Sequence, residues 1–158
     1  MTGGGKGLME AANRGAKDVG GRSVGCNIVL PVEQHPNAFL DKWVNIHYFF
    51  VRKTLLVKYS FAFIVLPGGF GTKDEFFEAL TLTQTKRIKQ FPIIVFNKEF
   101  HHDLFEYIEH MKQKGTISTE DLSLILLTDS IDEAITFIKE KSIAHYGLTA
   151  ERKPKVDF

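Results

Sequence analysis

Four short apolar runs along the chain predict the strands of a sheet. Val, Ile, Leu and Phe dominate these runs, which lack the alternation of polar and apolar positions that marks a half-exposed strand. Such continuous apolar character is typical of strands covered on both faces. The runs are Val24–Leu30, Phe61–Leu66, Pro92–Phe96 and Leu122–Leu127.

Between these runs, apolar residues recur with the spacing of amphipathic helices. Ser130, followed by Glu133, predicts a capping box at the start of the last helix. Strands that alternate with helices predict an α/β fold with a mostly parallel sheet and helices on both faces. The predicted helix faces are Leu8, Ala11, Ala12 and Val19; Phe39, Trp43, Ile46, Phe50 and Val57; Leu104, Phe105, Ile108 and Met111; and Ile131, Ala134, Ile135 and Ile138.

The length and charge of the chain indicate one globular domain. The chain has 158 residues, of which 44% are apolar, enough for a single substantial core. We expect this domain over residues 1–145 and a tail over residues 146–158, whose basic run Arg152–Lys155 is interpreted as a solvated end. The formal net charge of +1 creates no overall field that would draw the protein to nucleic acid or a membrane.

The distribution of cysteine and of apolar residues favours a cytoplasmic protein. No apolar run reaches the length of a membrane span, and the first residues do not have the pattern of a signal peptide. The single cysteine, Cys26, lies within an apolar run and cannot form an intrachain disulfide. A reducing compartment is therefore expected.

Two glycine-rich loops each lead into a predicted helix. The first, Thr2–Gly7, precedes a helix from Leu8, and the second, Leu66–Thr72, joins an apolar strand to a helix from Lys73. Glycine lets the backbone approach a ligand closely, and a helix start offers unpaired N–H groups and the positive end of its dipole. The loops therefore predict an anion site, most simply for phosphate. Neither is a Walker A sequence or a full dinucleotide fingerprint, and the alternative is a tight turn without a ligand.

The residues that could carry chemistry near these loops each have a structural alternative. Glu75 follows Thr72 by three residues, so either a capping box explains it or it is a carboxylate held beside a phosphate loop. Arg52 and Lys53, which we place late in the long predicted helix, are by themselves typical of a surface pair. The six histidines lack metal-ligand spacing, so no metal site is expected.

Taken together, the motifs resemble those of one enzyme family. Pro67–Glu75 matches the pattern PGGxGTxxE, Thr2–Ala12 resembles TGGGxGxMEAA, and Arg52 and Lys53 stand where that family carries an arginine–lysine pair. The family is that of the LOG ("lonely guy") proteins, cytokinin riboside 5′-monophosphate phosphoribohydrolases that are also labelled lysine decarboxylase-like. The resemblance covers nearly the whole chain.

This resemblance implies a Rossmann-like, doubly wound fold, from which the strand, helix and strand that family members carry before the TGGG turn are expected to be missing. It implies at least a homodimer, a substrate pocket close to the subunit interface, and no cofactor. It also implies catalytic roles for Arg52 and Glu75. The implied nucleotide- and phosphate-binding residues are Gly3, Gly4, Gly5, Gly7, Lys53, Gly68, Gly69, Gly71 and Thr72.

The implied reaction is hydrolysis of the N-glycosidic bond of a nucleoside 5′-monophosphate, AMP or N6-modified AMP, to free base and ribose 5-phosphate. Glu75 would stabilise an oxocarbenium-like ribose and orient water. Arg52 would either hold Glu75 and the ligand in register or support the departing base through its partners. The alternative is a non-catalytic protein that binds a nucleotide or a phosphorylated cofactor through the same loops. The sequence does not identify the base, and Phe70 is equally compatible with lying near the base and with packing against the fold.

Overall fold

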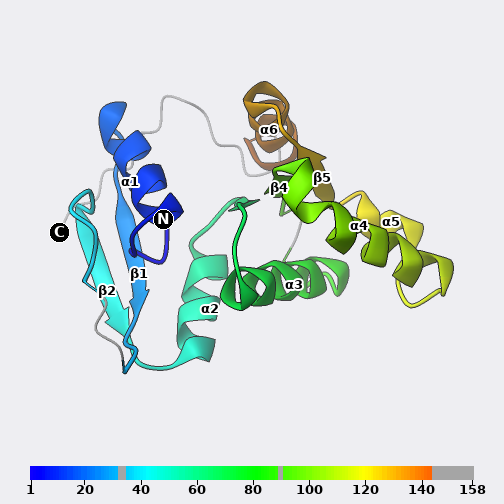
Figure 1. Cartoon of the computed structure of the whole chain (residues 1–158), viewed down its shortest axis with the longest axis horizontal. Helices are drawn as coiled ribbons and strands as arrows, with labels where there is room; N and C mark the ends of the chain where they lie inside the picture. Colours follow the sequence, from blue (N-terminus) through cyan, green and yellow to red (C-terminus); the bar gives the residue numbers. More distant parts are fainter. Residues whose placement is uncertain (32–34, 89–90, 144–158) are drawn as a thin grey trace. The chain divides into compact units, whose positions relative to one another are not determined.

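A computed structural model describes residues 1–31, 35–88 and 91–143. The described chain forms two compact units, one from Met1 to Ser60 and the other beginning at Phe61, and each is described by itself (Figure 1). The predicted tail over residues 146–158 lies outside the described residues. The boundary of the predicted domain therefore stays a prediction.

The first unit is built on a pair of parallel strands. β1 (Val24–Ile28) pairs with β2 (Lys42–Ile46), with Gly25 opposite Trp43. On the other edge of β1, Thr2 forms an isolated parallel bridge to Gly25. The helices of this unit are α1 (Leu8–Asp18) and α2 (Phe49–Lys58), and α2 contacts both strands.

The long helix predicted from the stripe Phe39–Val57 is wrong in its first half. The apolar residues of β2 and of the helix after it happen to continue one helical spacing, although they belong to two elements. β2 is rich in β-branched and aromatic residues, which favour strands. Pairing with β1 then decides the conformation, and the Asp41 carboxylate accepts a hydrogen bond from the Ser23 backbone N–H, 2.8 Å away, just before β2. Arg52 therefore lies in the first turn of α2 rather than late in a long helix.

The apolar face predicted for α1 is exposed, so the prediction that it packs against the core is wrong. Leu8 is 50% exposed and Val19, just beyond the helix, is 83% exposed. The buried residue of α1 is Asn13, which is 2% exposed. This helix is thus held to its unit by a polar side chain.

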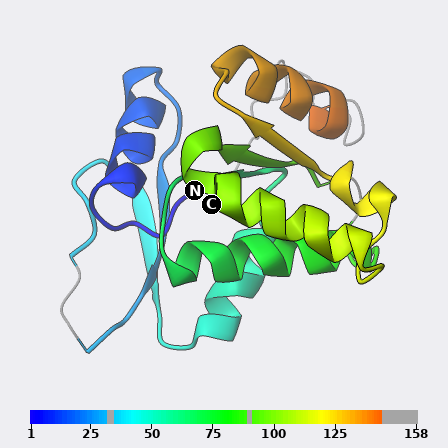
Figure 2. The ribbon, with the colours of Figure 1, turned by 45° about the vertical axis from the view of Figure 1, so that its right-hand side comes forward.

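The second unit contains a three-stranded parallel sheet in the order β3–β4–β5. Its strands confirm the predicted runs, except that Leu122 ends a short helix ahead of β5. Figure 2 shows α3 and α4 on one face of this sheet and α6 on the other. The elements are β3 (Phe63–Val65), α3 (Phe70–Gln84), β4 (Ile93–Phe96), α4 (Lys98–Gln113), α5 (Thr119–Leu122), β5 (Ile125–Thr128), α6 (Ile131–Ile138) and a π-helical turn over Lys139–Ile143.

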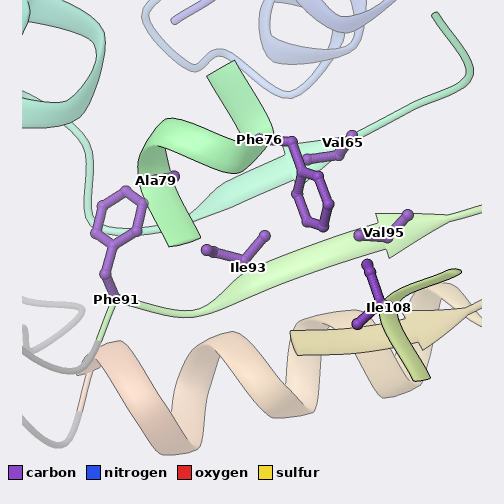
Figure 3. Close-up of a cluster of buried hydrophobic side chains, with 7 residues drawn as sticks. All are labelled: Val65, Phe76, Ala79, Phe91, Ile93, Val95 and Ile108. Atoms are coloured by element: carbon purple, nitrogen blue, oxygen red, sulfur yellow. The ribbon is translucent and has the colours of Figure 1, made fainter. Parts of the chain in front are cut away.

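The core of the second unit lies between β4 and the two helices α3 and α4. Phe76 and Ala79 of α3 point toward Ile93 and Val95 of β4 (Figure 3), and all four side chains have no exposed surface. Ile108 of α4 completes this layer and is 3% exposed. The core therefore fixes the helix that follows the second glycine loop.

Side-chain caps begin the later helices. Asn97, Ser118 and Ser130 cap α4, α5 and α6, and the predicted start of α6 is confirmed because Ser130 Oγ accepts a hydrogen bond from the Glu133 N–H at 3.3 Å. The Glu133 carboxylate accepts a hydrogen bond from Thr128 Oγ1 at 2.5 Å. At α5, hydrogen bonds to the Asp121 carboxylate from the Ser118 backbone and the Gln84 side chain lower the pKa of this group.

The α/β fold with parallel strands and flanking helices is confirmed, although its described strands are divided between two sheets. Within the described residues, no helix is both long enough and apolar enough to cross a membrane.

Replacing Phe76 by Ala should lower the free energy of unfolding by about 3–5 kcal/mol, because the change leaves a cavity in a closely packed core. The matched control is Phe70→Ala, at a position of the same helix that is 96% exposed, where the change should stay within ~0.5 kcal/mol. Urea unfolding followed by circular dichroism measures both. Equal losses for the two variants would contradict this description of the core.

Candidate functional site

The second glycine loop lies at the carboxyl end of β3, where α/β folds place ligands. Helix α3 begins at Phe70, with Gly69 as its N-cap and no side-chain hydrogen bond at the cap. The predicted capping box between Thr72 and Glu75 is therefore wrong, because both residues lie inside the helix. The first N–H groups of α3 have no side-chain cap, and the helix dipole adds to their attraction for an anion.

Gly68 lets the loop fold tightly onto the first turn of α3. A Cβ atom at Gly68 would lie 2.3 Å from Thr72 Oγ1 and 2.9 Å from Thr72 Cβ. Rotation of the threonine cannot relieve contacts with both atoms, so glycine is needed here. Phe70, by contrast, is 96% exposed, which excludes the interpretation that it packs against its own fold.

Two charged side chains follow the loop on α3. Glu75 is half-buried in the second turn, and its Oε2 is buried. The Lys73 Nζ is also buried, makes no hydrogen bond within the described part of the chain, and lies 5.2 Å from the centre of the Phe100 ring. Loss of hydration lowers the pKa of Lys73. A cation near a helix N-terminus is repelled by the helix dipole, so an anion bound at the loop would stabilise the charged form of Lys73.

The first glycine turn lies in the first unit and leads into α1. Gly4 and Gly7 have positive φ angles of 79° and 72°, which glycine adopts without strain. Gly7 is the N-cap of α1, and it too provides no side-chain hydrogen bond at the helix start. This turn therefore resembles the second loop in offering uncapped N–H groups.

Arg52 packs directly against the first glycine turn. Its Nε donates a hydrogen bond to the Cys26 carbonyl at 3.0 Å, which fixes the guanidinium at β1. A Cβ atom at Gly3 would lie 2.5 Å from Arg52 Nη2, so a larger residue here would require the guanidinium to shift. Lys53 follows in the same helix and is half-buried.

The structure thus brings the predicted site residues together in two groups. The first unit joins Gly3–Gly7 with Arg52, and the second joins Gly68–Thr72 with Glu75. Lys73 and the buried Asn13 and Asn37 were not predicted as site residues from the sequence. Asn13 lies outside the apolar face predicted for its helix and Asn37 lies in a loop, so no local pattern in the sequence indicated that this pair is buried.

A cavity of about 280 Å³ in the second unit is not part of these groups. Its lining includes Phe77, Leu80 and Gln84 from the second half of α3, and Leu124 and Ile125 at the start of β5. It therefore lies at the amino ends of the parallel strands, opposite the glycine loop. Among the described residues, no cluster of His, Cys, Asp and Glu could hold a metal ion.

Comparisons with known proteins agree with the arrangement of the motifs. The family model described as "possible lysine decarboxylase" matches residues 9–138. A cytokinin riboside 5′-monophosphate phosphoribohydrolase of Rhodococcoides fascians is 32% identical over 138 residues, which cover 84% of this chain and 68% of the relative. A protein of the same name from Arabidopsis thaliana is 28% identical over 154 residues, covering 94% and 70%.

A solved structure shows the same fold. The molybdenum cofactor binding protein of Rippkaea orientalis superposes with a TM-score of 0.62 at 23% identity, over 88% of this chain and 75% of that protein. From the family match over most of its length and from these relatives, the chain belongs to the LOG family, whose model carries the description "possible lysine decarboxylase".

Proposed function

We propose that this protein hydrolyses the N-glycosidic bond of a nucleoside 5′-monophosphate and releases the free base and ribose 5-phosphate. The observation that carries the proposal is the uncapped start of α3 at a glycine loop, with Glu75 one turn further along the same helix. The names of the relatives support this class of reaction.

The 5′-phosphate would bind at the loop Gly68–Thr72. The N–H groups at the start of α3, the Thr72 hydroxyl and the helix dipole all favour a phosphate oxygen. Lys73 adds a buried positive charge beside the loop. Binding energy gained at the phosphate is remote from the reacting carbon and serves to position the ribose.

Glu75 would act on that ribose. Glu75 follows Thr72 by three positions along α3, a rise of about 4.5 Å, which is the scale of the distance from a 5′-phosphate to the sugar ring. As the bond breaks, its electron pair leaves with the base and positive charge develops on the ribose. The Glu75 carboxylate would stabilise that charge and orient the water that adds to C1′, while the base takes up a proton.

Arg52 would be required for the same reaction. Its Nε is fixed on the Cys26 carbonyl, so its remaining N–H groups are held in a defined direction beside Gly3. A preorganised guanidinium loses little conformational entropy when it binds a carboxylate or phosphate. Lys53 and the Gly3–Gly7 turn would add further positive groups for the phosphate. Hydrolysis of this kind needs water and no cofactor.

The substrate proposed is AMP or an N6-modified AMP. The two relatives described above are named for a cytokinin riboside 5′-monophosphate, which supports a nucleoside monophosphate as the substrate class. The exposed ring of Phe70 at the loop is available to stack on a base.

We also propose that the protein is a homodimer, formed through an apolar surface of the first unit. Trp43, Tyr48 and Phe50 are 51%, 66% and 68% exposed, and the Tyr48 and Phe50 rings are 5.8 Å apart. Exposed aromatic groups of this kind mark interfaces.

Sedimentation should therefore show a dimer. Phe50→Lys should raise the dissociation constant of this dimer at least about tenfold without lowering the free energy of unfolding of the monomer. A monomeric wild-type protein at micromolar concentration would contradict this.

The decisive test of the reaction is incubation with AMP and with N6-isopentenyl-AMP, followed by chromatography of free base and ribose 5-phosphate. Glu75→Gln should reduce kcat by about 10²–10⁴-fold, because the neutral amide cannot stabilise a cationic sugar. Glu99→Gln, the same change at an exposed position in α4, should leave kcat unchanged.

Full turnover in Glu75→Gln would refute the role of Glu75. If the wild-type protein releases no base but is thermally stabilised by these nucleotides, it is a binding protein and the proposed reaction is wrong.

A second test concerns the shape of the phosphate loop. Gly68→Ala should lower the affinity for the nucleotide at least about tenfold, because the new Cβ displaces Thr72 from the first turn of α3. The matched control is Gly15→Ala in α1, where an added Cβ meets no atom within 4 Å. Calorimetric titration with ribose 5-phosphate measures both variants. Unchanged affinity in a folded Gly68→Ala protein would exclude this loop as the phosphate site.

A further inference from the structure

A buried polar network lies beneath the first glycine turn. Its members come from four separate segments: Thr2 ahead of the turn, Asn13 in α1, Ser23 before β1, and Asn37 in the loop after β1. Asn13, Ser23 and Asn37 are 2%, 1% and 8% exposed. Burial of so many polar groups is favourable only if their hydrogen bonds are made.

Asn37 uses its whole side-chain amide in this network. Its Nδ2 donates to the Gly5 carbonyl at 3.0 Å, the Gly4 carbonyl at 3.2 Å and Asn13 Oδ1 at 2.9 Å. Its Oδ1 accepts a hydrogen bond from the Phe39 N–H at 3.1 Å, and its own backbone N–H donates to the Gly4 carbonyl at 2.9 Å. Asn37 therefore holds the carbonyl oxygens of two successive glycines.

The rest of the network fixes the direction of the Asn37 amide. Asn13 Oδ1 also accepts a hydrogen bond from Thr2 Oγ1 at 2.7 Å, while Asn13 Nδ2 donates to Ser23 Oγ at 2.8 Å. Asn13 thus presents an acceptor to Asn37, which must turn its NH₂ group toward both Asn13 and the turn. Thr2 Oγ1 in addition accepts the Gly4 N–H at 3.0 Å.

The network directs carbonyl oxygens of the turn and N–H groups of the turn toward different surroundings. The carbonyl oxygens of Gly4 and Gly5, which would repel an anion, are directed at Asn37 inside the unit. Within the described part of the chain, the N–H groups of Lys6, Gly7 and Leu8 donate no hydrogen bond, and α1 has no side-chain cap. These N–H groups are therefore available to a ligand at this turn, whereas the carbonyl oxygens of Gly4 and Gly5 are not.

We propose that Asn37 is a positioning residue for phosphate binding: it holds the Gly4 and Gly5 carbonyls away from the 5′-phosphate so that the N–H groups of Lys6, Gly7 and Leu8 face it. This role rests on the proposed function, in which the Gly3–Gly7 turn assists the phosphate site. Asn37 itself does not contact the substrate.

The test compares one chemical change at two positions of the network. Asn37→Asp replaces the donor with an oxygen that faces three acceptors, and the carbonyl oxygens of Gly4 and Gly5 carry no hydrogen to donate to it. In Asn13→Asp the new oxygen faces the Ser23 hydroxyl, which can rotate to donate, and Asn37 keeps its NH₂ group. Both variants add one buried negative charge, so charge alone would affect them alike.

We expect the dissociation constant for ribose 5-phosphate, measured by calorimetry, to rise at least about tenfold more in Asn37→Asp than in Asn13→Asp. The Asn37→Asp variant should also raise KM for AMP more than it lowers kcat, because the turn is remote from the reacting carbon. Equal losses of affinity in the two variants, both shown to be folded by cooperative thermal unfolding, would overturn the proposal.

A second measurement on the unmodified protein decides the question even where a variant fails to fold. On titration with inorganic phosphate, the ¹⁵N–¹H signals of Lys6, Gly7 and Leu8 should shift, while that of Gly4, whose N–H is held by Thr2, should move little. A shift centred on Gly4, or none in this turn, would overturn the proposal. These signals do not depend on turnover, so a protein that shows them and yet releases no base refutes the proposed reaction alone.

Discussion

The close approach of a side chain to a glycine backbone is the constraint on which both candidate anion sites depend. At Gly68 the Thr72 side chain occupies the space of a Cβ atom, and at Gly3 the guanidinium of Arg52 does so. In each case the missing side chain allows the backbone of the turn to approach that side chain closely. The helices that follow, α1 and α3, then begin without side-chain caps, whereas α4, α5 and α6 are capped by Asn or Ser. A ligand at these turns would supply the missing acceptors.

The parts of the fold that could be predicted from the sequence are those in which local pattern and tertiary burial agree. Ile93, Ile94 and Val95 form a continuous apolar run, and all three are fully buried in β4. The pattern failed over Lys42–Ile46, where the apolar spacing fits a helix but pairing with β1 imposes a strand. Four of the five residues of β2 are exposed, so this strand also lacks the buried positions that an apolar sequence pattern would indicate. Long-range pairing is not encoded in local periodicity, which explains this error.

The same distinction applies to the candidate site. The glycine loops and the positions of Arg52 and Glu75 follow from motifs contiguous in sequence, and each motif carries its own physical reason. Asn37 has no such signal, because its partners Gly4 and Asn13 lie 33 and 24 residues away. The start of α3 was misplaced for a different reason. A threonine followed three residues later by a glutamate satisfies the capping-box pattern, but the glycines allow the helix to begin earlier, at Phe70.

The two turns are stabilised by different kinds of interaction, and this difference has a physical basis. The helix after the second loop is fixed by the apolar side chains of Phe76 and Ala79, which have no exposed surface. Apolar packing sets the position of a helix but exerts no directional force on a carbonyl group, so it cannot decide which way a peptide unit points. The first turn contains consecutive glycines, whose peptide units can readily reverse. The buried amide of Asn37 donates hydrogen bonds to the carbonyl groups of the turn and so fixes the direction in which they point, which apolar packing cannot do. An apolar side chain of similar size at position 37 would keep the backbone hydrogen bond to the Gly4 carbonyl but would leave the orientation of the Gly5 carbonyl undetermined.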